Sequence, residues 1–153
     1  MSALQVPRWT PHVTVATVVV RDGHLLLVEE AIDGRAVLNQ PAGHLEPGES
    51  LGAAALRETL EETGWTVRLT AFIGTYQWTA ADGTPFLRFA YAAEPVSHDP
   101  LRPLDTGILR TRWLTPAELR AEPSRLRSPL VEKVVDDFLA GQRHPLSIVK
   151  EVA

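Results

Sequence analysis

The sequence predicts an α+β fold in which helices pack on a mixed β-sheet. Apolar, β-branched runs lie both before and after one isolated helical stretch, and strands do not alternate strictly with helices. The composition is that of an ordinary globular chain, with 44% hydrophobic and 22% charged residues. A chain of 153 residues can bury a sizeable core, so residues 1–153 are expected to form a single domain.

The N-terminal part of the chain is expected to open with a β-hairpin. Val13–Val20 is almost entirely apolar and β-branched, which predicts a buried strand, and His24–Val28 predicts its partner after a short glycine-containing turn. A loop is expected at Asn39–Gly43, because Pro41 cannot donate to a ladder and Gly43 permits backbone angles closed to other residues.

A helix is predicted next, with a signal at each end. Ser50 is a suitable N-cap residue, and Glu49 beside it favours the positive end of the helix dipole. The helix should end at Thr63, because Gly64 can adopt the left-handed conformation that terminates helices.

Helical periodicity divides this helix into two faces. At about 100° per residue, Glu58 and Glu62 fall together on one face. The opposite face carries Ala53, Leu56 and Leu60, and this face is expected to pack on the sheet.

The rest of the chain alternates between predicted strands, loops and short helices. A capping box at Thr115 predicts the start of a short helix. The other expected elements are strands at Trp65–Trp78, Phe86–Ala92 and Ile108–Leu114, a loop at Val96–Gly107, a C-terminal helix at about Ser128–Ala140 and a short terminal strand at His144–Val149.

Charge and composition exclude several classes of partner. The net charge of −4 gives no electrostatic reason to expect a nucleic-acid polymer or an anionic membrane. Because the chain has no cysteine, it can form neither a disulfide nor a zinc–thiolate site. The N-terminus lacks a basic start followed by an apolar run, so we expect no signal peptide and a cytoplasmic location.

The predicted helix concentrates acidic side chains around one arginine. The residues are Arg57, Glu58, Glu61 and Glu62. Carboxylates this close repel one another, so a cation is expected beside them. Glu58 and Glu62 lie one turn apart and could reach the same Mg²⁺, which prefers oxygen ligands, while Glu61 could hold a second ion or orient water. A solvated acidic face is the alternative interpretation.

These acids belong to a longer pattern of fixed residues. The pattern consists of Gly43, Glu49, Arg57, Glu58, Glu61, Glu62 and Gly64. At about 7% usage each, such a set arises by chance on the order of 10⁻⁸ per start position. It resembles, at every fixed position, the G-x5-E-x7-R-E-U-x-E-E-x-G-U box of the Nudix hydrolases, where U is apolar. Thr59 is a mild departure at the first U position.

The resemblance implies a Nudix fold, an α/β/α sandwich around a mixed β-sheet. It also implies hydrolysis of nucleoside diphosphates linked to another group, with Mg²⁺ as cofactor and Mn²⁺ as a substitute. The implied metal-binding and catalytic acids are Glu58, Glu61 and Glu62, with the Gly43 carbonyl as a further ligand. Arg57 would orient a glutamate of the box. Since the general base varies within the family, Glu58 and Glu61 remain alternatives for it.

Segments outside the box resemble one group of phosphatases in this family. They are PHVTVATVV from Pro11, NQPAGHLE from Asn39, TPFLRF from Thr84, LRSPLV from Leu126 and GQRHPL from Gly141. This implies release of inorganic phosphate from nucleoside tri- and diphosphates, hydroxymethylpyrimidine pyrophosphate and thiamin pyrophosphate, by a monomer or weak homodimer. The alternative is a housecleaning pyrophosphatase acting on oxidised dNTPs, ADP-ribose or dinucleoside polyphosphates. A non-catalytic ligand sensor is disfavoured, because every glutamate of the box is present.

Four residues outside the box are candidates for contacts with a small-molecule substrate. Trp78 could stack on a base and Arg88 could bind phosphate, the alternatives being a core tryptophan and a solvated arginine. Gln40 could donate a hydrogen bond to substrate or simply support its loop. Arg127 precedes a helix whose N-terminus could hold a phosphate, although a plain surface position is the alternative.

A further acid from a later loop would complete the metal site. Asp99 and Asp105 are the candidates, but aspartate in a polar loop commonly forms a turn. His44 lies at a variable position of the box, and we assign it no role.

Overall fold

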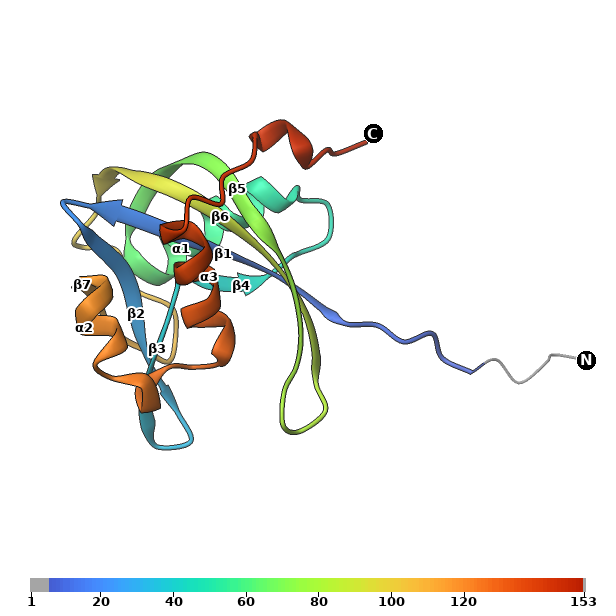
Figure 1. Cartoon of the computed structure of the whole chain (residues 1–153), viewed down its shortest axis with the longest axis horizontal. Coiled ribbons are helices and arrows are strands. Elements are labelled where there is room, and N and C mark those ends of the chain that lie inside the picture. The colour runs from blue at the N-terminus through green and yellow to red at the C-terminus, as the bar shows by residue number, and fades with distance from the viewer. Residues whose placement is uncertain (1–5, 153) are drawn as a thin grey trace, which may run out of the picture.

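The computed structural model describes residues 6–152, arranged as a mixed sheet with helices on both faces (Figure 1). The strands are β1 (His12–Arg21), β2 (His24–Ile32), β3 (Arg35–Asn39), β4 (Ala42–His44), β5 (Trp65–Thr79), β6 (Pro85–His98) and β7 (Ile108–Leu114). The helices are α1 (Leu51–Thr63), α2 (Pro116–Arg120) and α3 (Pro129–Leu139), with short 3₁₀ turns at Pro123–Arg125 and Leu146–Ile148.

Strand β1 is the centre of the sheet. It runs parallel to β6 and antiparallel to β2 and β4, and the strand order is β3-β2-β1-β6-β5, with β7 paired to β2. The sheet is therefore mixed, as predicted. Strands β5 and β6 form a long antiparallel hairpin, and its yellow-green tip extends away from the body of the sheet in Figure 1.

Alternation along the strands supplies a core on each face of the sheet. Val15 and Tyr91 face one way and pack with the alanines of α1. Val18 and Ala92 face the other way and pack with Val134 and its neighbours on α3. This arrangement confirms the predicted sandwich. No helix within residues 6–152 has the length and apolar character needed to cross a membrane.

The boundaries of α1 are those expected from its capping residues. Ser50 accepts a hydrogen bond from the backbone N–H of Ala53, and Gly64 adopts φ 75° while its N–H reaches Leu60 O. The capping box at Thr115 is also formed, and Ser128 caps α3.

The predicted core face of α1 is wrong. Leu56 is 39% exposed and Ala53 is also exposed, whereas Ala54, Ala55 and Thr59 are buried. The prediction placed the core directly opposite the acidic face of the helix. The acids instead face strand β4 and the loop before β7, so the helix is turned and packs on the sheet through its small side chains.

Three further expectations differ from the structure. The predicted loop at 39–43 is occupied partly by the ends of β3 and β4, and β3 itself is an additional strand. Gly43 has no positive φ, so unusual backbone angles do not explain this glycine. The predicted terminal strand is a 3₁₀ turn, and only His144 forms a β-bridge, to Phe72.

Candidate active site

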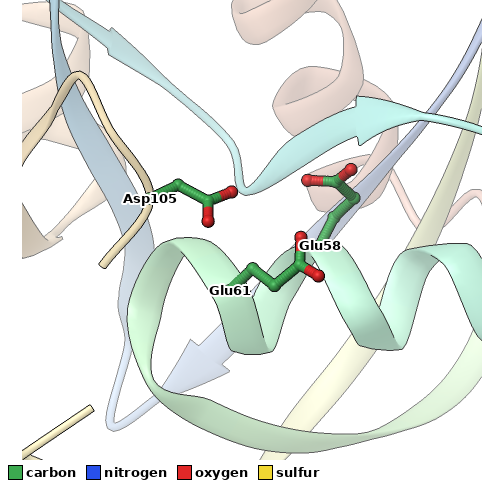
Figure 2. Close-up of side chains that lie close together, drawn as sticks. All are labelled: Glu58, Glu61 and Asp105. Carbon is green, nitrogen blue, oxygen red and sulfur yellow. The ribbon is translucent and has the colours of Figure 1, made fainter. Parts of the chain in front are cut away.

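Three carboxylates meet beside α1. Glu58 and Glu61 rise from this helix, and Asp105 faces them from the loop before β7 (Figure 2). One carboxylate oxygen of each residue lies within 4.8 Å of one carboxylate oxygen of each of the other two. The loop is held in place because the backbone N–H of Asp105 donates to Glu61 O at 3.1 Å. The structure therefore brings the later-loop acid to the helix.

The local electrostatics favour a cation at this cluster. Burial raises the pKa of the Glu58 carboxyl, the Arg57 guanidinium opposes that rise, and the neighbouring acids Glu61 and Asp105 add to it. Burial and the charge of Glu61 likewise raise the pKa of Asp105. Oxygen ligands at this spacing suit a hard divalent cation such as Mg²⁺, which would favour the ionised carboxylates.

Arg57 ties the helix to the loop that precedes it. Its guanidinium donates to both carboxylate oxygens of Glu49, at 2.6 and 3.0 Å, and these hydrogen bonds raise the pKa of Arg57. It also donates to Glu58 at 2.8 Å, to Glu61 at 3.2 Å and to the backbone oxygen of His44 at 3.0 Å. Arg57 thus fixes the positions of two cluster acids and their distance from β4.

Gly43 lies where no side chain fits. A Cβ atom on Gly43 would sit 2.1 Å from Cδ of Glu58. The backbone of β4 therefore passes directly against the Glu58 carboxylate. This close approach, and not backbone conformation, accounts for glycine at this position, and it is compatible with a role for the Gly43 carbonyl as a ligand.

Glu62 occupies a different environment from the other acids of α1. It is 7% exposed, and its Oε1 accepts a hydrogen bond from the backbone N–H of Ala42 at 2.7 Å. The pKa of Glu62 is raised to about 8. Burial is the main cause and the charge of Glu30 adds to it, while the hydrogen bond from Ala42 opposes the rise. Glu62 is not one of the three clustered acids, so its role as a metal ligand stays a prediction.

A cavity of about 300 Å³ adjoins the acids on the α3 side of the sheet. Gly43 lines this cavity, and its backbone also lies directly against the Glu58 carboxylate. The cavity and the acid cluster are therefore neighbours. Its other lining residues are Thr14, Glu30, Ala42, His44, Trp78, Ala80, Asp82, Thr84, Phe86, Arg88, Arg127, Ser128 and Leu130.

Three of the four predicted substrate residues line this cavity: Trp78, Arg88 and Arg127. Trp78 stacks on Phe86, with ring centroids 5.6 Å apart. Arg88 is 6% exposed and is therefore not a solvated residue, and burial lowers its pKa to about 10, so it stays charged at neutral pH. Arg127 is half-exposed and lies 3.7 Å from Glu30.

Gln40 and Asp99 do not join the site. Gln40 is buried outside the cavity lining, where its Nε2 donates to Val131 O at 2.7 Å and its Oε1 accepts from Arg88 at 3.1 Å. Its side chain holds the Arg88 guanidinium, so a role for Gln40 in substrate binding stays a prediction. Asp99 accepts from the N–H of Leu101, as a turn-forming aspartate does.

Among the lining residues that sequence reasoning missed are two polar ones on strands β1 and β2, Thr14 and Glu30; together with Arg88 we call them the floor of the cavity. Thr14 lies inside the predicted strand Val13–Val20, and Glu30 lies just beyond the predicted strand His24–Val28. Each is a polar residue in or beside an apolar run. An acid or hydroxyl at the end of an apolar strand was the available signal, but it does not say which strands lie together.

Comparisons with known proteins agree with this geometry. Residues 10–135 match the NUDIX domain. Phosphatase NudJ of Escherichia coli strain K12 is 48% identical over 139 residues, covering 91% of this chain and 90% of that protein. Phosphatase NudJ of Shigella flexneri is similar to the same extent.

Solved structures share the fold. A NUDIX hydrolase from Nitrosomonas europaea superimposes with a TM-score of 0.91 at 48% identity, covering 94% of this chain and 98% of that one. A MutT NUDIX hydrolase from Burkholderia pseudomallei has a TM-score of 0.73 at 21% identity, covering 84% of this chain and 98% of that one, a likeness of fold alone.

Proposed function

The chain belongs to the Nudix hydrolase family, and from that premise we propose that it is a metal-dependent phosphatase of small phosphorylated substrates. The proposed substrates are nucleoside tri- and diphosphates and hydroxymethylpyrimidine pyrophosphate, with thiamin pyrophosphate as a further candidate. The proposed product is inorganic phosphate. The 48% identity to Phosphatase NudJ supports the phosphatase class.

One observation carries the proposal. The cluster of Glu58, Glu61 and Asp105 lies beside a cavity of about 300 Å³, and Gly43 borders both. A diphosphate that spans this border would place its phosphates at the acids and its organic group in the cavity. Acids alone would repel such a substrate, so the arrangement supports a cation between them.

The donor set fits Mg²⁺ or Mn²⁺. The carboxylates of Glu58, Glu61 and Asp105 and the carbonyl of Gly43 would hold the ion, and Glu62 is a further candidate. When bound, the ion would polarise a phosphoryl oxygen and lower the pKa of the attacking water.

The chain's own residues would position substrate and move the proton. Arg57 holds Glu58 and Glu61 by direct hydrogen bonds and so fixes both acids relative to the phosphate. Glu58 or Glu61 accepts the proton from water as general base. Trp78 and Phe86 offer a stacking surface for the organic group.

Product analysis tests this function. The enzyme is incubated with Mg²⁺ and each proposed substrate, and in a separate reaction with ADP-ribose, and phosphate, pyrophosphate and AMP are measured separately. We expect phosphate alone. Pyrophosphate, or AMP from ADP-ribose, would contradict the proposal and support a housecleaning pyrophosphatase instead. Running the reaction in ¹⁸O-water identifies the phosphorus that water attacks, because the product containing that atom gains the label.

A further inference from the structure

The cavity lining contains a carboxylate, Glu30, that lies outside the cluster of Glu58, Glu61 and Asp105. Glu30, on β2, has a side chain that is 14% exposed. Its nearest cation is Arg127 at 3.7 Å, beyond hydrogen-bonding distance, and Arg88 also acts on it electrostatically. Within residues 6–152 no hydrogen-bond donor is found for this carboxylate, and it lies outside the cluster of three acids. A partly buried carboxylate with no hydrogen-bond donor from these residues can accept hydrogen bonds from a ligand in the cavity.

Two other polar groups of the floor are unpartnered. Thr14 Oγ1 and Arg88 Nε are buried and have no hydrogen-bond partner in the described part of the chain. Thr14 and Arg88 are direct neighbours in the β1–β6 register and both line the cavity. Together with Glu30, the floor offers carboxylate and hydroxyl oxygens as acceptors, and the Thr14 O–H and the unpartnered Arg88 Nε–H as donors.

The wall of the cavity suits a flat ring. Trp78 and Phe86 stack at 5.6 Å with 23° between their planes, and both line the cavity. Aromatic side chains of this kind bind heterocycles by their faces. A ring in this position would have its edge free for the polar groups of the floor.

We propose that Glu30 is a specificity-determining residue that accepts a hydrogen bond from an amino group on a heterocyclic ring bound in this cavity. The proposal rests on the proposed function for the position of the phosphates. An amino group beside a ring nitrogen provides two N–H donors and one acceptor: the N–H groups suit the Glu30 carboxylate, and the ring nitrogen can accept from Thr14 or Arg88. In the oxo ring the exocyclic group is an acceptor and the neighbouring ring nitrogen carries the N–H, so the oxo ring is disfavoured where its exocyclic group faces Glu30.

The same carboxylate would orient the substrate. A phosphate beside Glu30 would be repelled by that carboxylate and attracted by Arg88, whereas the acids at the Gly43 border can hold a cation that binds phosphate directly. The ring is therefore held inward and the phosphates outward, toward Gly43 and the acids of α1. Arg127, half-exposed and facing Glu30, lies along that outward path.

The test compares substrates whose rings carry either an amino group or an oxo group with a neighbouring ring N–H. The pairs are CTP with UTP and ATP with ITP, and kcat/KM is measured with Mg²⁺ for the wild type and Glu30→Gln. We expect the wild type to prefer the amino member by about 10-fold or more, chiefly through KM. In Glu30→Gln the preference should fall to within about twofold. Equal rates for both members in the wild type would overturn the proposal.

Two controls separate a lost contact from a damaged fold. Glu132→Gln removes an exposed carboxylate from α3, outside the cavity, and should leave the preference unchanged. Glu30→Asp keeps the charge but shortens the side chain, so an intermediate preference is expected. If Glu30→Gln does not fold, Glu30→Asp decides: an unchanged preference in that variant contradicts the proposal.

A binding measurement distinguishes this inference from the function on which it rests. Cytidine and uridine are titrated without metal and followed by ligand-observed NMR. If no triphosphate is hydrolysed, the proposed function fails, yet tighter binding of cytidine that Glu30→Gln abolishes still supports the inference. If hydrolysis proceeds but both nucleosides bind alike, the function stands and the inference is wrong.

Discussion

Adding a single methyl group at Gly43 is expected to displace the Glu58 carboxylate. In Gly43→Ala the new Cβ would stand 2.1 Å from Cδ of Glu58, so the carboxylate must move. A displacement of about 1 Å can cost about 100-fold in rate, and we expect a loss of at least that order in kcat. Phosphate release with Mg²⁺ measures it.

Gly52→Ala is the matched control. It lies in α1, where the added methyl would meet only Leu69 Cδ1 at 3.4 Å. It should preserve activity and stabilise the protein by about 0.5–1 kcal/mol, the usual gain for alanine over glycine in a helix. If both variants were equally active, the close approach of Gly43 to Glu58 would have no bearing on catalysis.

Glu58 itself can be tested by an isosteric change. Glu58→Gln keeps the shape and the contact with Arg57 but removes both the charge and the capacity to accept a proton. We expect turnover to fall by about 10²–10⁴-fold with the fold intact, as judged by circular dichroism and thermal unfolding. Near-normal turnover in Mg²⁺ would make the assignment of Glu58 wrong, and Glu132→Gln controls for loss of a carboxylate elsewhere.

At this scale the sequence predicts the box acids and leaves their partners undetermined. Fixed spacing on one helix places Glu58 and Glu61 together whatever surrounds them. Asp105 and Glu30 reach the site only through the paths of a loop and a strand, which no local pattern encodes. For Gln40, nearness in sequence to Gly43 predicted contact with substrate. In the structure its side chain is buried against α3 and accepts a hydrogen bond from Arg88.

At the scale of elements, α1 is joined to β1 by a buried pair of hydroxyls. Thr59, at an apolar position of the box, donates to Ala55 O and lies 2.8 Å from Thr17 Oγ1, so Thr17 must be the donor between them. Thr59→Val would leave the Thr17 hydroxyl buried without a partner, at a cost of about 1–3 kcal/mol. Thr17→Val should cost less, because Thr59 keeps its bond to Ala55.

A double-mutant cycle checks this pairing. Replacing both residues with valine removes donor and acceptor together, so the double variant should be more stable than the sum of the single effects by about 0.5–3 kcal/mol. Urea unfolding provides the free energies. Additive effects would show that the hydroxyls do not stabilise one another.

Element boundaries and element packing differ in how far the sequence predicts them. Ser50, Gly64 and Thr115 mark helix ends through local hydrogen bonds and dihedral angles, and those ends are confirmed. The buried face of α1 depends on what lies across from it. Because β4 and the loop before β7 occupy the acidic side, Leu56 is left outside, and this could not be read from the helix alone.

At the scale of the whole molecule, Glu62 links stability to pH. In the metal-free protein its pKa is about 8, against an ordinary value of 4.5. Between these values the folded state binds more protons than the unfolded state, so stability should fall as pH rises from about 5 to 8. Each kcal/mol lost lowers Tm by about 2–4 °C for a chain of this size. Thermal unfolding in EDTA at a series of pH values measures the decline.

Glu62→Gln isolates this contribution. Groups outside this set of acids, such as His44 with its lowered pKa, act equally in both proteins, so the difference between wild type and variant belongs to Glu62 and its charge interactions with Glu30, Glu58 and Asp105. The variant should lose less stability over the interval. Parallel pH curves for the two proteins would contradict the assignment. Adding Mg²⁺ to the wild type should weaken the decline, because a cation favours the ionised carboxylate.

The central place of β1 also has a consequence during folding. In the hairpin, β1 pairs with β2 only at its C-terminal end, through Val20 and Arg21. Residues from His12 to Val19 pair with β6, which comes more than 60 residues later in the chain. Parallel pairing over such a separation is slow, and until it occurs an apolar, β-branched segment stays uncovered. Refolding by dilution should therefore compete with aggregation, with yields that fall as the protein concentration rises.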